Sequence, residues 1–179
     1  TAVTAITQDY NTSVSSPADP TRTGYTFSAW YSDAGLTTPY AFTTMPASSI
    51  SLYAKWNINQ YTITFISNGG TAVTAITQDY NTSVTQPADP TKTGYTFDAW
   101  YSDAGLTTPY TFTTMPANSI SLYAKWTIDQ YTITFDSNSG TAVTAITQDY
   151  NTSVTQPADP TKTGYTFDAW YSDIALTTP

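Results

Sequence analysis

The chain has 179 residues, 40% of them hydrophobic, and its thirteen acidic residues outnumber its five basic ones, giving a net charge of −8. Every acidic residue is an aspartate, and the sequence contains no Glu, His or Cys. The absence of cysteine excludes disulfides, thiol chemistry and Cys-based metal sites. The acidic balance disfavours nucleic-acid binding and attachment to anionic membranes, and no apolar run is long enough for a transmembrane helix, so we expect no membrane insertion.

The most informative feature is an internal repeat. The segment TAVTAITQ begins at Thr1 and returns at Thr71 and Thr141, which gives a period of 70 residues. A period this long is typical of a string of small domains. Such duplication multiplies length or valency rather than building one asymmetric active site. Residues 1–56 and 71–126 differ at only six positions: Ser15/Thr85, Ser16/Gln86, Arg22/Lys92, Ser28/Asp98, Ala41/Thr111 and Ser48/Asn118.

The boundaries of one module follow from the alternation of apolar and polar side chains. Residues 50–56 alternate as a strand, and residues 61–65 alternate on the opposite parity. A change of phase requires a turn, bulge or linker, so we place linkers at residues 57–60 and 127–130. The predicted modules are repeat 1 (residues 1–56, without its first strand), repeat 2 (61–126, complete) and repeat 3 (131–179, without its last hairpin). Because the sequence starts and stops inside a repeat, we expect a segment of a longer protein.

Within repeat 2 the chain reads as short strands separated by turns, so the predicted fold class is mainly β, or α+β at most, with no long helices. Residues 68–70, Asn-Gly-Gly, predict a tight turn. One short helix is possible in the proline-containing crossover, capped by Asp89 or Thr91 and ended by Gly94. The predicted strands, in chain order, are Tyr61–Phe65, Thr71–Gln78, Tyr95–Tyr101, Tyr110–Thr113 and Ile120–Trp126.

Aromatic side chains have two possible roles. A cysteine-free module of about 66 residues lies near the lower limit for independent folding, so it needs large buried side chains. We therefore assign the Trp and Phe residues to the core. Tyr101, Tyr110 and Tyr123 are left open between core and surface, because tyrosine tolerates half-exposure and is common at interfaces. The alternative is an exposed platform for sugars or a partner, formed by Trp100, Trp126, Tyr95, Phe97 and Tyr123.

No residues are assigned to catalysis, cofactor binding or metal binding, so we expect no enzyme. Without His, Cys or Glu, only an aspartate pair such as Asp98 and Asp103 could serve as general acid and base. The turn Asp136-Ser137-Asn138 adds a further carboxylate, but no calcium-loop motif is present. Ordinary turn chemistry explains these aspartates better. A stabilising cross-link between Lys92 or Lys125 and an Asn is disfavoured, because Lys125 lies on the outer parity of its strand.

The ordered motifs of repeat 2 resemble a known family. They are YTITFxSNGG at the start, P-x-x-P-T-x-x-G-Y-x-F-x-x-W-Y in the centre and L-Y-A-K-W at the end. This combination is similar to the Listeria–Bacteroides repeat family, also called internalin B-type B repeats. Repeat 3 departs from it with Ser139 in place of Gly69 and with Ile174-Ala175 in place of Ala104-Gly105. The resemblance implies tandem β-grasp-like (ubiquitin-like) modules of bacterial surface or secreted proteins, with no catalytic residues.

Three functions fit this sequence. The first is a stalk or spacer at the cell surface or outside the cell, with neighbouring repeats of the same chain as partners. The second is an adhesive array that binds a host surface or a glycan through repeated weak sites; it predicts an exposed aromatic patch in every copy. The third is an extracellular filament, because the open edges of repeats 1 and 3 invite self-association.

Overall fold

The computed structural model describes all residues from Thr1 to Pro179 and contains strands but no helix. The predicted mainly-β fold class is therefore confirmed. The chain divides into two compact units, one formed by Thr1–Pro90 and Ala99–Lys125, the other by Thr91–Asp98 and Trp126–Pro179. The strands are β1 (Tyr25–Tyr31), β2 (Tyr53–Ile58), β3 (Gln60–Ile66), β4 (Ile76–Asp79), β5 (Tyr95–Tyr101), β6 (Ile120–Ile128), β7 (Gln130–Ile133) and β8 (Ile146–Asp149).

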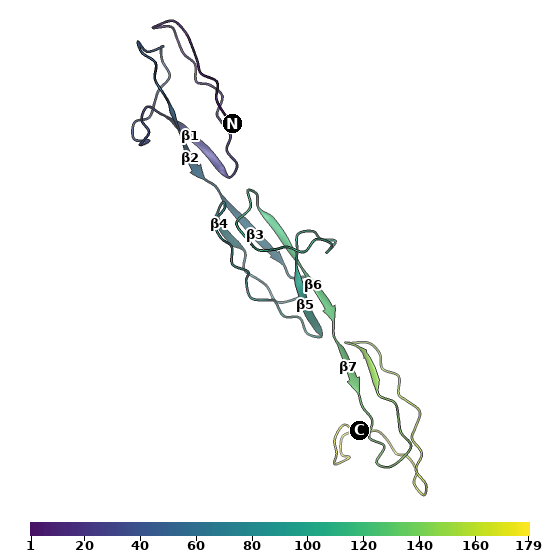
Figure 1. The fold of residues 1–179 in the computed structure, drawn as a ribbon. Helices are drawn as coiled ribbons and strands as arrows, with labels where there is room; N and C mark the ends of the chain where they lie inside the picture. Colours follow the sequence, from purple (N-terminus) through teal and green to yellow (C-terminus); the bar gives the residue numbers. More distant parts are fainter. The chain divides into compact units, whose positions relative to one another are not determined.

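The complete repeat is built on a four-stranded sheet with the strand order β4-β3-β6-β5 (Figure 1). Strand β3 pairs antiparallel with β4 and parallel with β6, with Ile63 opposite Ile120 and Phe65 opposite Leu122. The apolar residues of β3 alternate with threonines, so Ile63 and Phe65 on one face are buried while Thr64 on the other face is exposed to solvent. The first and last strands of repeat 2 thus lie side by side at the centre of its sheet.

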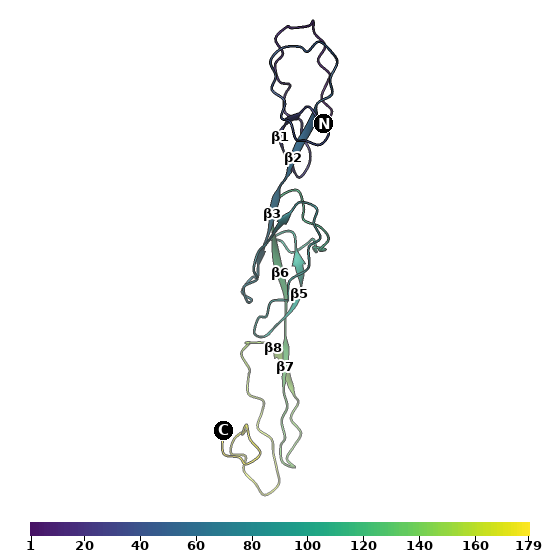
Figure 2. The ribbon, with the colours of Figure 1, turned by 90° about the vertical axis from the view of Figure 1, so that its left-hand side faces the viewer.

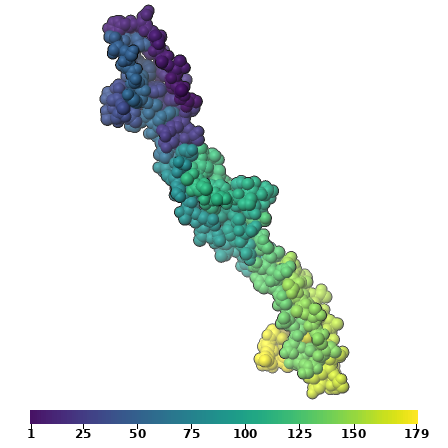
Figure 3. All heavy atoms as spheres, viewed as in Figure 1, coloured from purple at the N-terminus to yellow at the C-terminus, as the bar shows by residue number.

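The core of repeat 2 lies on the inward face of this sheet. Trp100 is 1% exposed, and Ile63, Met115 and Leu122 are fully buried. The ring of Phe65 meets Trp100 edge to face, with ring centroids 4.8 Å apart, which is a favourable aromatic arrangement. The space-filling view shows the surface of repeat 2 in teal and green (Figure 3).

Repeats 1 and 3 keep only parts of this sheet. In repeat 1, β1 pairs antiparallel with β2, and a register shift lies between Phe27 and Ala29. In repeat 3, β7 pairs antiparallel with β8, from Gln130 opposite Asp149 to Ile133 opposite Ile146 (Figure 2). The segment after β8 forms no further strand.

The strands continue into both predicted linkers. Strand β2 ends at Ile58 and β3 begins at Gln60, so only Asn59 separates them. Asp129 holds the same position between β6 and β7. The change of side-chain parity between consecutive repeats is therefore accomplished around a single residue.

The structure corrects three local predictions. No helix forms in the crossover, because Pro87 and Pro90 remove backbone donors and disfavour helical geometry in the residues before them. The predicted strand Thr71–Gln78 is paired only from Ile76, since the sheet offers its first residues no ladder partner. The predicted strand Tyr110–Thr113 is absent; these residues instead make single backbone hydrogen bonds, such as Tyr110 N–H to Trp100 O at 2.8 Å and Val84 N–H to Thr113 O at 3.0 Å.

Candidate functional site

The loop after β5 is organised by one aspartate. The carboxylate of Asp103 accepts hydrogen bonds from the backbone N–H groups of Thr107 (3.1 Å) and Thr108 (2.8 Å). These donors, Thr108 first, lower the pKa of Asp103 below its ordinary value because they favour the charged form. The same loop turns through Leu106, whose φ of 55° is in the left-handed region.

The same loop recurs in the other two repeats. Asp33 accepts from Thr37 and Thr38 in repeat 1, and Asp173 accepts from Thr177 and Thr178 in repeat 3. The pKa of each carboxyl is lowered, led by the backbone hydrogen bond from Thr38 and from Thr177 respectively. Repeat 3 has Ile174-Ala175 where repeat 2 has Ala104-Gly105, yet the loop keeps its geometry, with Leu176 again at a φ of 55°.

Two of the aspartates considered for catalysis or metal binding, Asp103 and Asp136, accept hydrogen bonds from backbone N–H groups of their own turns. The carboxylate of Asp103 faces the backbone of its own loop. Asp136 accepts a hydrogen bond from the N–H of Asn138 at 2.9 Å, which is an Asx-type turn. Asp98 lies exposed on β5. The arrangement of Asp103 and Asp136 can hold their loops in place.

The aromatic residues divide between core and surface in a way that the sequence predicts only in part. Trp100 is buried as expected, and Trp126 and Phe97 are half-buried, with ring centroids 5.5 Å apart. Of the tyrosines that the sequence left undecided, Tyr101 lies in the core and Tyr110 and Tyr123 are half-buried; Tyr95 is also half-buried. The Nζ of Lys125 lies 3.3 Å from the Tyr101 hydroxyl and 5.0 Å from the ring centroid, which accounts for the half-burial of a lysine on the outer parity.

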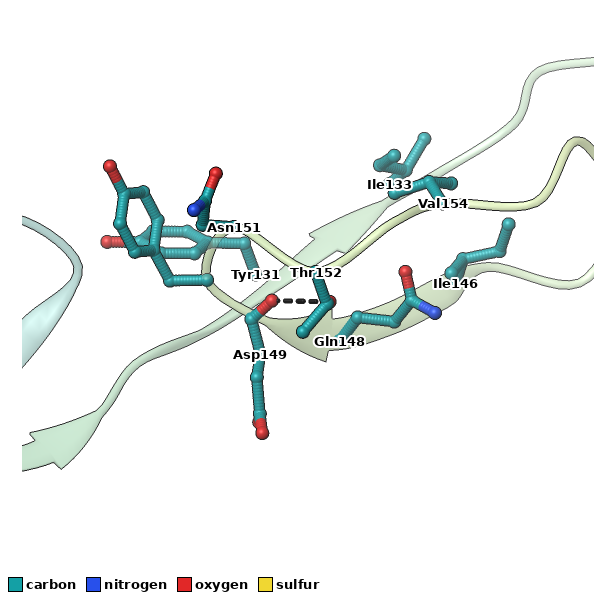
Figure 4. Close-up of a pocket in the computed structure, with 9 residues that line it drawn as sticks. Tyr131, Ile133, Ile146, Gln148, Asp149, Asn151, Thr152 and Val154 are labelled. Atoms are coloured by element: carbon teal, nitrogen blue, oxygen red, sulfur yellow. Dashed lines mark hydrogen bonds between the residues drawn. The ribbon is translucent and has the colours of Figure 1, made fainter.

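Repeat 3 carries a hollow of about 240 Å³ beside β7 and β8 (Figure 4). Its apolar lining comes from Tyr131, Ile133, Ile146 and Val154. At its polar end Thr152 donates its hydroxyl to the carbonyl of Asp149 at 2.7 Å. Ile133 is 44% exposed here, whereas the equivalent Ile63 of repeat 2 is fully buried and lies opposite Ile120 of β6. The hollow is thus the part of the core that a closing hairpin covers in repeat 2.

Sequence reasoning missed a second feature, which occurs between consecutive repeats. The ring of Tyr80 lies against the α-carbon of Gly24, and the ring of Tyr150 lies against that of Gly94. Each pair is separated by 56 residues in the chain, so no local pattern signals the contact. The only available hint was the fixed recurrence of both residues with the repeat.

Comparison with known proteins gives a consistent result. The family model of the Listeria–Bacteroides repeat domain matches residues 1–55, 61–125 and 131–179. A protein of Evansella cellulosilytica described as a Gly-rich membrane protein is 38% identical over 177 residues, covering 98% of this chain and 20% of the relative. Internalin H of Listeria monocytogenes is 41% identical over 128 residues, covering 69% of this chain and 23% of the relative.

The chain spans about a fifth to a quarter of the length of these relatives. No helix in the structure is long or apolar enough to cross a membrane. The family match extends over all three repeats and leaves only residues between them, or at their last positions, unmatched. The chain therefore belongs to the Listeria–Bacteroides repeat family.

Proposed function

We propose that this chain is a structural spacer of a bacterial cell-surface or secreted protein, an extended and non-catalytic array of repeat modules. One observation carries the proposal: between residues 61 and 126 no Trp, Tyr or Phe side chain is exposed. Ile66 is the only large hydrophobic residue exposed in that range. A module whose aromatic residues support its own core, and whose surface is mostly Thr, Ser and Asn, suits a spacer.

The proposed location rests on the family relatives. Internalin H and a protein described as a Gly-rich membrane protein both contain long segments similar to this chain. Since each relative is several times longer than the matched region, the repeats would be one part of a larger surface protein. A spacer can gain or lose units without changes elsewhere, which agrees with the near-identity of the copies.

Small-angle X-ray scattering of arrays with increasing numbers of the 61–130 unit tests this proposal. A spacer predicts a maximum dimension that grows linearly with the number of units at every protein concentration. The matched control replaces residues 127–130 by a flexible Gly/Ser linker, which should make the dimension grow more slowly, roughly with the square root of length. Compact particles from the native array would refute the extended spacer.

A second candidate is self-association through strand edges. In repeat 2 the outer strands of the sheet are β4 and β5, and an open strand edge can pair with another chain. A scattering mass that rises with concentration would support a filament-forming role. The adhesive alternative, with a host-surface or glycan ligand, predicts an aromatic patch in every copy; repeat 2 offers no exposed aromatic side chain for one.

A further inference from the structure

The contact between consecutive repeats begins at a glycine. Gly24 and Gly94 adopt φ values of 77° and 74°, a left-handed conformation that favours glycine. At both positions a second requirement is added, because a Cβ would overlap the ring of Tyr80 or Tyr150 from the following repeat. Gly164 has the same backbone conformation, with φ of 80°, yet nothing lies within 4 Å of its Cβ position.

The linker residue connects the two sides of this contact. The N–H of Asp129 donates to the carbonyl of Gly94 at 2.9 Å, and the N–H of Tyr150 donates to the carbonyl of Asp129 at 2.8 Å. The hydroxyl of Thr96 donates to the carboxylate of Asp129 at 2.7 Å. The linker is therefore bonded to the repeat before it and to the repeat after it.

The junction between repeats 1 and 2 has the same arrangement, with Asn59 in the position of Asp129. Asn59 bonds to the carbonyl of Gly24 at 2.9 Å and accepts from the N–H of Tyr80 at 2.8 Å. Thr26 donates to the amide oxygen of Asn59 at 2.7 Å. Because both junctions share these bonds although one linker residue is Asn and the other Asp, the geometry belongs to the repeat rather than to one linker sequence.

Tyrosines surround the contact. Tyr150 meets Tyr95 of repeat 2 and Tyr131 of its own repeat edge to face, with centroids 6.4 Å and 6.1 Å apart. Where no adjoining repeat is present, the matching tyrosines are open: Tyr10 is 71% exposed and Tyr165 is 73% exposed. Tyr80 and Tyr95, which have this contact, are half-buried, and Tyr150 is 36% exposed.

We propose that the glycine and tyrosine form a docking interface between consecutive repeats, in which Tyr80 or Tyr150 seats on Gly24 or Gly94 and fixes the linker residue. The partner of this surface is the adjoining repeat of the same chain. The inference deepens the proposed spacer function, because it makes each linker a fixed joint rather than a free hinge.

Amide hydrogen exchange measured by NMR on the whole chain tests the joint. The linkers differ in sequence, Asn57-Ile58-Asn59 against Thr127-Ile128-Asp129, so the amides of Asn59 and Asp129 report on the two joints separately. Gly94→Ala should speed exchange at Asp129 by about two- to tenfold, the factor expected for losing one net hydrogen bond, and leave Asn59 unchanged.

Gly164→Ala is the matched control, because it introduces the same backbone strain where no tyrosine ring lies. It should leave both reporters unchanged. Equal effects of Gly94→Ala and Gly164→Ala at Asp129, or no protection of Asp129 in the unmodified chain, would overturn the proposal.

A second variant keeps the test decisive if Gly94→Ala disturbs β5. Tyr150→Ala removes the ring without backbone strain and should also speed exchange at Asp129, whereas Tyr10→Ala, at an exposed tyrosine, should not. Unchanged exchange in Tyr150→Ala would refute the interface. This outcome is distinct from failure of the spacer, which compact scattering particles would show whether or not the joint is fixed.

Discussion

At the scale of single residues, the loop aspartates have a structural role, because each carboxylate accepts hydrogen bonds from the backbone of its own loop. Asp103 lies in a loop where two backbone N–H groups converge on one carboxylate, and Asp33 and Asp173 do the same. A carboxylate in this position replaces the backbone acceptors that the turn through Leu106 does not provide. The charge serves the local fold, which explains its recurrence in every copy.

Asp103→Asn should weaken the dependence of thermal stability on acid pH. The folded-state pKa of Asp103 is lowered, so its contribution is present above the unfolded-state pKa and is lost as pH falls through the lower folded-state pKa. The check is the melting temperature by circular dichroism from about pH 2 to about pH 6. The control Asp19→Asn makes the same charge change at an exposed site. An unaltered pH profile in Asp103→Asn would contradict this account.

At the scale of elements, the central pairing of β3 with β6 separates the complete repeat from the partial ones. Where β6 lies beside β3, Ile63 and Leu122 are fully buried. Repeat 1 has the β6-type strand β2 without a β3 neighbour, and its Leu52 is only half-buried. The same sequence thus gives a closed core or an open one according to which strands are present.

Ile63→Ala and Ile133→Ala form a matched pair that measures this difference. Removing Ile63 empties a packed core and should lower the free energy of unfolding by about 2–5 kcal/mol. Ile133 is 44% exposed, so its removal should cost less than about 1 kcal/mol. Urea unfolding followed by circular dichroism gives both values. Equal losses in the two variants would show that β6 does not bury Ile63 as the structure indicates.

At the scale of the whole molecule, the three repeats include different parts of the same module, and repeat 2 contains both the first strand and the closing hairpin. Appending a copy of residues 110–128 after Pro179 should complete repeat 3, because Pro179 occupies the position of Pro109. The hollow beside β7 should close, and the urea m-value should rise with the extra buried surface. A control extension with Asp at the position of Leu122 should give no such gain. If the native extension left the m-value unchanged, the hollow would not be the site of the closing hairpin.

The strands and the turn after β3 could be predicted from local pattern. Strand β5 was predicted from Tyr95 to Tyr101 and has those limits, and Asn68 and Gly69 adopt the left-handed values of 49° and 87° that their identities predict. Prediction failed where strand formation depends on a pairing partner. Residues 71–75 have a strand-like composition, but no neighbouring strand pairs with them. The glycine–tyrosine contact was beyond prediction, because a turn glycine gives no sign of a ring that comes from another repeat.

The parallel arrangement of β3 and β6 has a mechanical meaning. The chain enters repeat 2 at the start of β3 and leaves it at the end of β6, and the two strands run in the same direction from Ile63 opposite Ile120 to Ile66 opposite Tyr123. Tension on the two ends would drag these strands past each other along their length. The hydrogen bonds between them are then loaded together in shear, whereas a hairpin pulled from its open end unzips one bond at a time. A module built in this way resists stretching at its centre, where Ile63 and Leu122 are fully buried.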